Sequence, residues 1–303
     1  MSKHPSAELI QEIAIELGVN PSFVEKDWYA VQVLKLISEY NHSDITPVFS
    51  GGTSLSKGYG LIERFSEDID FKLQSATVKN KRECKEYRAE IVDLIQVQDG
   101  FTIDEATVIS QDGSRFFSFD ISYPQSHGLD AALRANLKLE MRFQTIPLAT
   151  ENRDIKSFAA QFMDEDAETT IECISPAETA ADKFSALLWR VVTRDYDDPN
   201  NDPTMIRHLH DLCALEKIAL AHEDFVPTIH TAFESDKGRG GMPHDMSLMD
   251  AAQKTLHDLR NWKVYKSDYR KFVDAMSYAT LEDRISFKMA IESFGRIITA
   301  VTQ

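Results

Sequence analysis

The pattern of hydrophobic and polar positions in the first 60 residues predicts two helices, a short strand and the start of a third helix. Residues 6–17 and 22–40 repeat apolar positions at helical spacing, and Asn20 followed by Pro21 is typical of a helix start. The run ITPVFS at 45–50 is β-prone and ends in a glycine pair, and the residues after the pair can begin a helix. We therefore expect a strand, a glycine turn and a helix start in direct succession.

The next segment alternates apolar and polar positions, as a strand buried on one face should. In EDIDFKL, at 67–73, every second residue from Ile69 onward is apolar. Side chains two residues apart in a strand point to the same face. Asp68 and Asp70 are therefore expected to project together from the face opposite Ile69.

The rest of the chain falls into a strand-rich part and a helical part. The pattern predicts a helix at 79–97, followed by three strands of an antiparallel meander, at 101–110, 115–123 and 136–143. After Cys173 the pattern changes to helices, which we expect at 176–193, at 204–221 and at several places between 223 and 302. The boundary is placed near 174, so the chain is predicted to be α+β with domains at 1–174 and 175–303.

Composition and charge narrow the class of protein. With 43% apolar residues the 303-residue chain can form a sizeable core, and no apolar run approaches the roughly 20 residues of a membrane helix. The start of the chain lacks the pattern of a secretion signal, so we expect a cytoplasmic protein with no membrane segment. The three cysteines are widely separated and odd in number, which favours reduced thiols over disulfides or a zinc site.

The net charge of −16, from 33 basic and 49 acidic residues, opposes indiscriminate attraction to phosphate backbones. A polyanionic substrate would need a local basic patch. The strongest candidate has five cations within ten residues, some at helical spacing: Lys79, Lys81, Arg82, Lys85 and Arg88. The alternative is that this segment is only a solvated helix face with Glu83 and Glu86 as counter-charges.

Two neighbouring features carry candidate chemistry. Two aspartates on one strand face repel each other, and a divalent cation such as Mg²⁺ relieves that repulsion. Just upstream, Gly51, Gly52, Thr53 and Ser54 combine a turn without side chains, hydroxyl groups and free backbone N–H groups at a helix start, which is how many proteins hold phosphate. Together the two features predict a site for a metal ion and a nucleotide.

The segment VFSGGTSLSKGYGLIERFSEDIDF resembles the first motif of the AbiEii/AbiGii nucleotidyl transferase toxin family, part of the DNA polymerase β-like nucleotidyltransferase superfamily. The resemblance extends over about residues 20–220, and the C-terminal helices match only in kind. It implies a mixed sheet flanked by helices, followed by a helical bundle at 175–303 that completes the nucleotide site. The gap from Gly52 to Asp68 is longer than usual in the superfamily, which leaves open whether Thr53, Ser54 or Ser66 contacts the terminal phosphates.

The resemblance also implies roles for the carboxylates. Asp68 and Asp70 would ligate Mg²⁺, which bridges the nucleotide phosphates and the attacking hydroxyl. A third carboxylate on a neighbouring strand completes such sites, and Glu140 in LKLEMRF is our choice. Asp120 in FSFDISY is the competitor, and Glu140 could instead be a surface acid on an edge strand.

Two later segments resemble other motifs of the family. In PAETAADKFSALLWRVVTRD, Lys183 would be a positive charge over the phosphates; in MIRHLHDLCAL, Asp211 matches a family aspartate, while His208 and His210 replace an aspartate and an aromatic residue. Asp211 would orient Lys183 through a salt bridge or serve only as a structural acid. The residues that the resemblance places at the nucleotide are Gly51, Gly52, Thr53, Ser54, Lys57, Arg64, Ser66 and Asp211.

The function implied is transfer of a nucleoside monophosphate from an NTP to an acceptor. We expect RNA, such as the 3′ end of tRNA, as the acceptor, and a role as the toxin of a toxin–antitoxin or phage-defence system with a cognate antitoxin protein. The alternatives are transfer to a protein hydroxyl, and a nucleotide-binding partner protein that has lost activity. The intact Asp68, Asp70 and Lys183 argue against the inactive protein, because binding alone does not need paired carboxylates.

Overall fold

The computed structural model describes residues 3–195, 198 and 201–302. The chain divides into two compact units. Unit 1 consists of Met1–Gly60 and Phe65–Ile174, and unit 2 consists of Leu61–Arg64 and Ser175–Gln303. The second unit thus begins after Ile174, close to the expected boundary, but it also takes in a short segment from the middle of unit 1's sequence.

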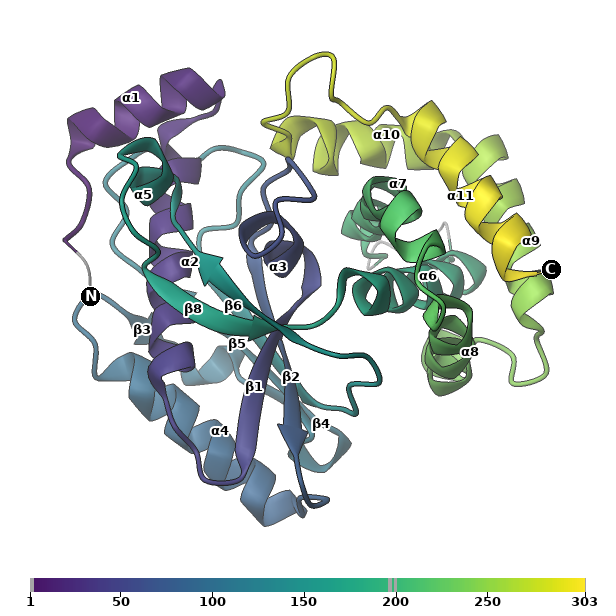
Figure 1. Ribbon diagram of the computed structural model, residues 1–303, viewed down its shortest axis with the longest axis horizontal. Coiled ribbons are helices and arrows are strands. Elements are labelled where there is room, and N and C mark those ends of the chain that lie inside the picture. The colour runs from purple at the N-terminus through teal and green to yellow at the C-terminus, as the bar shows by residue number, and fades with distance from the viewer. Residues whose placement is uncertain (1–2, 196–197, 199–200, 303) are drawn as a thin grey trace. The chain divides into compact units, whose positions relative to one another are not determined.

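Unit 1 is built on a mixed sheet that has eight strands among the described residues, in the order β3-β5-β6-β2-β1-β8-β7 with β4 paired to β5 (Figure 1). The α+β class predicted from the sequence is therefore confirmed. The strands are β1 (Ile45–Ser50), β2 (Asp68–Ser75), β3 (Thr102–Ile103), β4 (Ile109–Gln111), β5 (Phe116–Ser122), β6 (Leu137–Phe143), β7 (Glu151–Ile155) and β8 (Thr169–Cys173). Strand β2 pairs antiparallel with β1 and parallel with β6, so the two strands with candidate carboxylates are neighbours.

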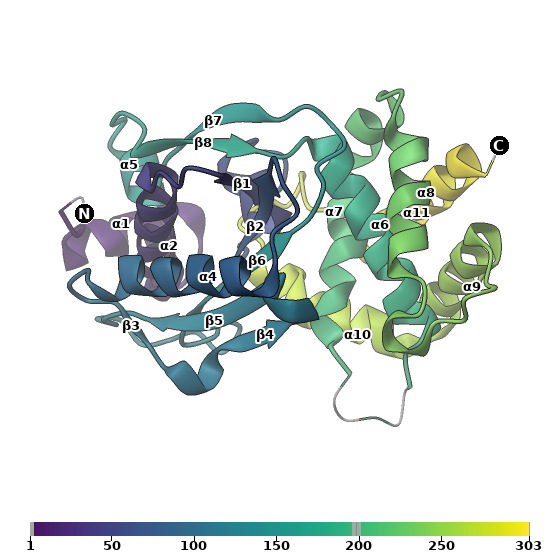
Figure 2. The same ribbon diagram turned by 90° about the horizontal axis from the view of Figure 1, so that it is seen from below.

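The two faces of this sheet differ in character. Alternate residues such as Phe71 on β2 and Met141 on β6 are buried, and this apolar face packs against α4 (Lys81–Gln96), whose Tyr87 ring lies 6.0 Å from that of Phe143 (Figure 2). The other face carries the polar residues of β2 and β6. Because α4 covers the apolar face, the basic residues on its exposed side lie on the side of the sheet opposite Asp68 and Asp70.

The remaining helices of unit 1 follow their sequence signals. They are α1 (Ala7–Leu17), α2 (Pro21–Glu39), α3 (Gly51–Lys57) and α5 (Phe158–Phe162). The side chain of Asn20 accepts a hydrogen bond from the backbone N–H of Ser22 at 2.9 Å, which fixes the start of α2 where it was expected. Helix α3 begins directly at the end of β1, so the glycine pair forms the first turn of the helix.

Two expectations for unit 1 need correction. The strand predicted at 101–110 is interrupted by a 3₁₀ turn at Glu105–Thr107, because the Asp104 carboxylate accepts a hydrogen bond from the backbone N–H of Ala106 at 2.9 Å and favours the turn. The region between β6 and unit 2, for which no element was predicted, contains β7, α5 and β8. Strand β8 pairs with β1 in parallel, and this pairing depends on contacts more than 100 residues apart in the chain.

Unit 2 is helical. Its helices are α6 (Pro176–Val192), α7 (Arg207–Leu220), α8 (Phe225–Asp236), α9 (Leu248–Asn261), α10 (Lys263–Phe272) and α11 (Phe287–Val301). Helix α6 contacts α7, α8 and α9 (Figure 1), and the segment Leu61–Arg64 joins this unit through a hydrogen bond from the Tyr278 N–H to the Glu63 carbonyl at 3.0 Å. Across the part of the chain that the structure describes, no helix is both long enough and apolar enough to cross a bilayer.

Candidate active site

The turn between β1 and α3 has room for glycine only. Gly51 has a φ of +75°, in the left-handed region that favours glycine, and a Cβ at this position would overlap the side chain of Asp70. Ser50 and Asp70 are directly opposed in the β1–β2 register. The carboxylate of Asp70 therefore lies against the start of α3, as the order of the two sequence features suggested.

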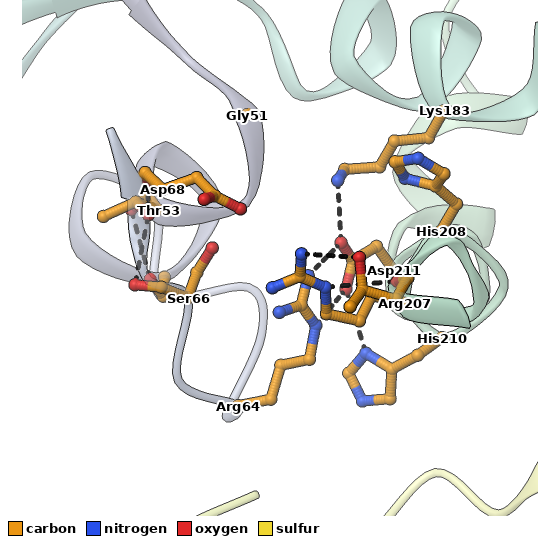
Figure 3. Close-up of polar contacts among 12 residues, drawn as sticks. Gly51, Thr53, Arg64, Ser66, Asp68, Lys183, Arg207, His208, His210 and Asp211 are labelled. Atoms are coloured by element: carbon orange, nitrogen blue, oxygen red, sulfur yellow. Dashed lines mark hydrogen bonds and ion pairs between the residues drawn. The ribbon is translucent and has the colours of Figure 1, made fainter. Parts of the chain in front are cut away.

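Two of the three candidate hydroxyls near this turn are engaged by the protein's own backbone. Thr53 donates to the carbonyls of Ser66 and Asp68 (Figure 3). Ser54 donates to the carbonyl of Gly51 at 3.0 Å. Each hydroxyl has a single proton to donate. The Ser66 hydroxyl has no hydrogen-bond partner within the residues that the structure describes, so of the three it is the one whose proton is available to a phosphate oxygen.

The candidate metal carboxylates share the polar face of the sheet. Asp68 and Asp70 are alternate residues of β2, and Asp70 lies directly opposite Glu140 of β6 in the parallel register. Asp120 lies on the same face but one strand farther away, opposite Lys138. Strand β6 is an interior strand between β5 and β2, so the interpretation of Glu140 as an edge-strand acid is wrong. The register thus favours Glu140 over Asp120 as the third carboxylate.

Two of these three carboxylates, Asp68 and Glu140, are each paired with a cation. The Arg134 Nη1 atom lies 2.9 Å from Asp68 Oδ1, and the Lys138 Nζ atom lies 2.5 Å from Glu140 Oε1. Among the described residues, no three histidine, cysteine or carboxylate side chains already converge at the spacing of metal ligands. The donor set nevertheless fits Mg²⁺, which prefers carboxylate oxygens, and the three acids occupy adjacent positions on one face.

The backbone of Arg134 is held in place by hydrogen bonds with two buried side chains. The buried pair Lys26 and Glu67, 2.5 Å apart, binds it from both sides: Lys26 donates to the Arg134 carbonyl at 2.7 Å and Glu67 accepts from its N–H at 2.7 Å. Neither Arg134 nor this pair was singled out from the sequence. The only available signal was the position of Glu67 directly before the Asp68 motif, because the contact with Lys26 spans 41 residues and that with Arg134 spans 67.

The position of Lys57 does not fit its expected role. Its side chain is buried in unit 1, where it forms an ion pair with Asp27 of α2 and its ammonium lies 3.7 Å from the centre of the Phe158 ring. The ammonium is therefore turned into the protein rather than toward the carboxylate face. Lys57 links α3 to α2 and α5, and we leave it out of the nucleotide site.

In unit 2 the family-like residues form a buried cluster around Asp211 (Figure 3). The Asp211 carboxylate accepts two hydrogen bonds from Arg64, at 2.7 and 2.5 Å, and pairs with the Lys183 ammonium at 2.8 Å. The His210 ring nitrogen lies 3.0 Å from the same carboxylate. The salt bridge considered for Asp211 and Lys183 is thus present. Arg64, expected at the nucleotide, is 2% exposed and directs its guanidinium to Asp211 instead.

The charges of this cluster are fixed by their neighbours. Burial alone would raise the pKa of Asp211, but Arg64 and Lys183 outweigh that effect and hold the pKa well below its usual value. Burial, reinforced by Lys183 and Arg190, holds the pKa of His208 well below its usual value. The histidine in place of the family's aspartate is therefore neutral, and it lies 2.7 Å from the Arg190 guanidinium.

Comparison with known proteins places this arrangement in a family. A family model described as "Nucleotidyl transferase AbiEii toxin, Type IV TA system" matches residues 37–297, which is most of the chain. Among solved structures, MenT4, a nucleotidyltransferase toxin of Mycobacterium tuberculosis, aligns with a TM-score of 0.53 at 15% identity, over 97% of this chain and 98% of that one. At that identity the likeness shows the fold alone. Comparison with curated protein sequences gives no match. From the extent of the family match, the chain belongs to the AbiEii nucleotidyl transferase toxin family, and is a nucleotidyltransferase toxin of the type IV toxin–antitoxin class.

Proposed function

We propose that this nucleotidyltransferase moves a nucleoside monophosphate from an NTP to the 3′ end of an RNA, with tRNA as the acceptor, in a Mg²⁺-dependent reaction. The observation that carries the proposal is the placement of Asp68, Asp70 and Glu140 on one face of the sheet, with Asp70 against the Gly51 turn. Paired carboxylates beside a phosphate-binding turn are what metal-assisted transfer of a nucleotide requires.

Asp68, Asp70 and Glu140 would hold the metal. Bound there, Mg²⁺ would neutralise charge on the phosphates and on the attacking hydroxyl. Ser66 supplies a hydroxyl donor to phosphate, because the protons of Thr53 and Ser54 are already engaged. The resemblance to the family suggests Lys183 as a further positive charge for the phosphates, and Asp211 would orient its ammonium.

Toxicity would follow from modification of an acceptor that every growing cell needs. A tRNA with an altered 3′ end cannot be aminoacylated, so protein synthesis would stop until a cognate antitoxin counteracts the enzyme. Arrest of growth by this route would also serve defence against phage. NTPs and tRNA are both found in the cytoplasm, where we place the reaction.

The test is incubation of the purified protein with each α-³²P-labelled NTP, Mg²⁺ and either total RNA or a protein lysate. We expect label on RNA of tRNA size with one NTP preferred, and no label once EDTA is added. Label on protein bands in place of RNA would support transfer to a protein hydroxyl. Absence of label from both pools would support the inactive nucleotide-binding protein.

The first prediction concerns the carboxylates. Asp68→Asn and Asp70→Asn should each lower incorporation of label by at least about a thousandfold, because they remove charge that stabilises the transition state. The same variants should keep a cooperative thermal transition, since both side chains lie on the partly exposed polar face. Glu90→Gln, on the exposed side of α4, is the matched control and should retain wild-type turnover. Wild-type turnover in either aspartate variant would refute the metal site.

A further inference from the structure

Helix α10 presents a basic face to solvent. Lys263, Lys266 and Arg270 are exposed and stand at positions i, i+3 and i+7, so they lie on one side of the helix. Lys271 is exposed beside them. In the part of the chain that the structure describes, none of these four side chains forms an ion pair.

The acids of this region offset the positive charge of that face only in part. The acidic residue of α10, Asp268, is buried and paired with Arg194 at 3.0 Å. The next acid along the chain, Asp274, follows the helix, is exposed and interacts electrostatically with Arg270. In a chain with a net charge of −16, a helix whose exposed charged residues are all cations is unusual.

The cations of the basic segment singled out from the sequence, on α4, are more fully neutralised by acids than those of α10. On α4, Arg82 is paired with Glu86 at 2.7 Å, and Lys79 is buried and paired with Asp44 at 3.1 Å. Lys81, Lys85 and Arg88 remain, but acids are interleaved with them on the same helix, and α4 covers the face of the sheet opposite the carboxylates.

Helix α10 also belongs to the same packed cluster as Lys183. Its buried Tyr269 ring lies 6.4 Å from the ring of His210, which contacts Asp211 at 3.0 Å. Asp211 in turn holds the Lys183 ammonium at 2.8 Å. The basic face is therefore the outer surface of the helix whose inner surface packs toward the Lys183–Asp211 pair.

We propose that the basic face of α10, formed by Lys263, Lys266, Arg270 and Lys271, is the docking surface for the phosphate backbone of the RNA acceptor. The inference rests on the proposed RNA acceptor and adds where the protein binds it. Unpaired lysine and arginine side chains on one face are the electrostatic footprint of a nucleic-acid surface. Trp262, at the start of the helix and 47% exposed, supplies an aromatic surface on which a base can stack.

A membrane surface is the other polyanion that a basic helix can bind, and the structure disfavours it. An interfacial helix inserts an apolar face into the lipid. The apolar side of α10 is occupied, because Tyr265 and Tyr269 are buried and the Tyr269 hydroxyl donates to the Ile285 carbonyl at 2.7 Å.

The experiment compares two matched triple reversals in the full chain. One is Lys263→Glu, Lys266→Glu and Arg270→Glu on α10; the other is Lys81→Glu, Lys85→Glu and Arg88→Glu on α4. Each changes the net charge equally and alters cations that form no ion pair among the described residues; five of the six are exposed, and Arg88 is partly exposed. The probe is a transcribed tRNA with a 3′ CCA end, and its affinity is measured by fluorescence anisotropy from 50 to 300 mM KCl without NTP. A circular dichroism melt of each variant checks folding.

The α10 reversal should weaken tRNA binding by at least about tenfold and flatten the log–log salt slope by about 2 to 3 units, since three phosphate contacts are lost. The α4 reversal should alter neither, and Trp262→Ala should weaken binding about fivefold without changing the slope. If the α10 reversal does not fold, the triple glutamine variant replaces it, with the same direction expected.

Wild-type affinity and slope in the folded α10 variant would overturn this inference while leaving the proposed function intact, provided that the protein still labels tRNA. Loss of binding in the α4 variant alone would assign the docking surface to α4. If the wild-type protein neither binds nor labels tRNA, the RNA acceptor fails and this inference fails with it. Binding to anionic phosphatidylserine vesicles that is lost only in the α10 variant, with tRNA binding unchanged, would identify the face as a membrane surface.

Discussion

At the turn before α3, the absence of a Cβ atom on Gly51 leaves room for the carboxylate of Asp70. Gly51 adopts a left-handed φ of +75° and lies so close to Asp70 that a methyl group would displace the carboxylate. Glycine therefore has two functions here, one conformational and one steric. The carboxylate that we assign to the metal is positioned by the absence of a side chain on the neighbouring residue.

This predicts different outcomes for two glycine substitutions. Gly51→Ala should cost about 1–3 kcal/mol of stability for its backbone conformation and should also abolish transfer, because Asp70 must move. Gly60 also has a left-handed φ, of +64°, but no atom lies within 4 Å of its Cβ position. Gly60→Ala should thus share the loss of stability and retain activity. Thermal melts and label incorporation measure both, and equal activity in the two variants would contradict the steric argument.

Arg134 leads to a prediction about metal affinity. Its guanidinium competes with a divalent cation for Asp68, 2.9 Å away. Arg134→Gln should therefore raise the affinity of the nucleotide-free protein for Mn²⁺ by about two- to fivefold, the size expected for a partly exposed ion pair. The buried Lys26–Glu67 pair forms hydrogen bonds with the backbone of residue 134, so the substitution should leave the backbone in place.

Mn²⁺ binding is measured by titration with electron paramagnetic resonance. Lys85→Gln removes the same charge from the opposite side of the sheet and should leave Mn²⁺ affinity close to wild type. A lower affinity in Arg134→Gln would mean that Arg134 orients Asp68 for the metal instead of competing with it.

At the scale of elements, one buried carboxylate holds together three segments of unit 2. Asp211 of α7 binds Lys183 of α6 and both nitrogens of the Arg64 fork in the segment Leu61–Arg64. The carboxylate is fully buried, so its removal would leave two cations in a low-dielectric environment. Asp211 is therefore a structural clamp as well as the partner of Lys183.

The structural contribution of Asp211 can be compared with that of a more exposed ion pair on the same helix. Asp211→Asn should cost about 3–5 kcal/mol of unfolding free energy, as expected when one partner of a buried pair is removed. Glu216 of α7 also binds an arginine fork, that of Arg296, but in a partly exposed position, and Glu216→Gln should cost at most about 1 kcal/mol. Urea unfolding at pH 7 gives both values.

The direction in which the stability contributed by Asp211 changes with pH follows from the direction of its pKa shift. The folded pKa of Asp211 is depressed, so its ionised form stabilises the fold fully above the ordinary aspartate value of 3.8, and this stabilisation is lost as the pH falls below 3.8 toward the folded pKa. The difference in stability between the wild type and Asp211→Asn should be constant from pH 7 to 5 and shrink only at more acidic pH. A difference that already declines between pH 7 and 6 would mean that another group dominates.

At the scale of the whole molecule, charge is distributed unevenly along an acidic chain. Two of the carboxylates that we propose as metal ligands, Asp68 and Glu140, are part of the net charge of −16 and already have basic partners, Arg134 and Lys138. The same chain includes a helix, α10, whose exposed charges are all positive. The overall composition opposes indiscriminate attraction to phosphate backbones, whereas the uneven distribution leaves a local basic surface, which we propose as a site for phosphate.

Local sequence determined much of what is seen here. The alternation in EDIDFKL placed Asp68 and Asp70 on one face, and Asn20 with Pro21 set the start of α2, because both depend only on neighbours in the chain. The strand-to-helix order around the glycine pair followed in the same way. The family motif, read from the same residues, implied the fold class and the enzyme class, and the match over 37–297 confirms both.

Tertiary structure alone decided which charges meet. Arg64 turns to Asp211 across 147 residues, Arg134 reaches Asp68 across 66, and Lys57 points inward to Asp27 instead of toward a nucleotide. The opposition of Asp70 and Glu140 needs the parallel pairing of two strands that are distant in sequence. The pattern along the chain predicts which face of a strand or helix a side chain lies on. Its partner on that face depends on how segments distant in sequence pack together, and local spacing does not predict that packing.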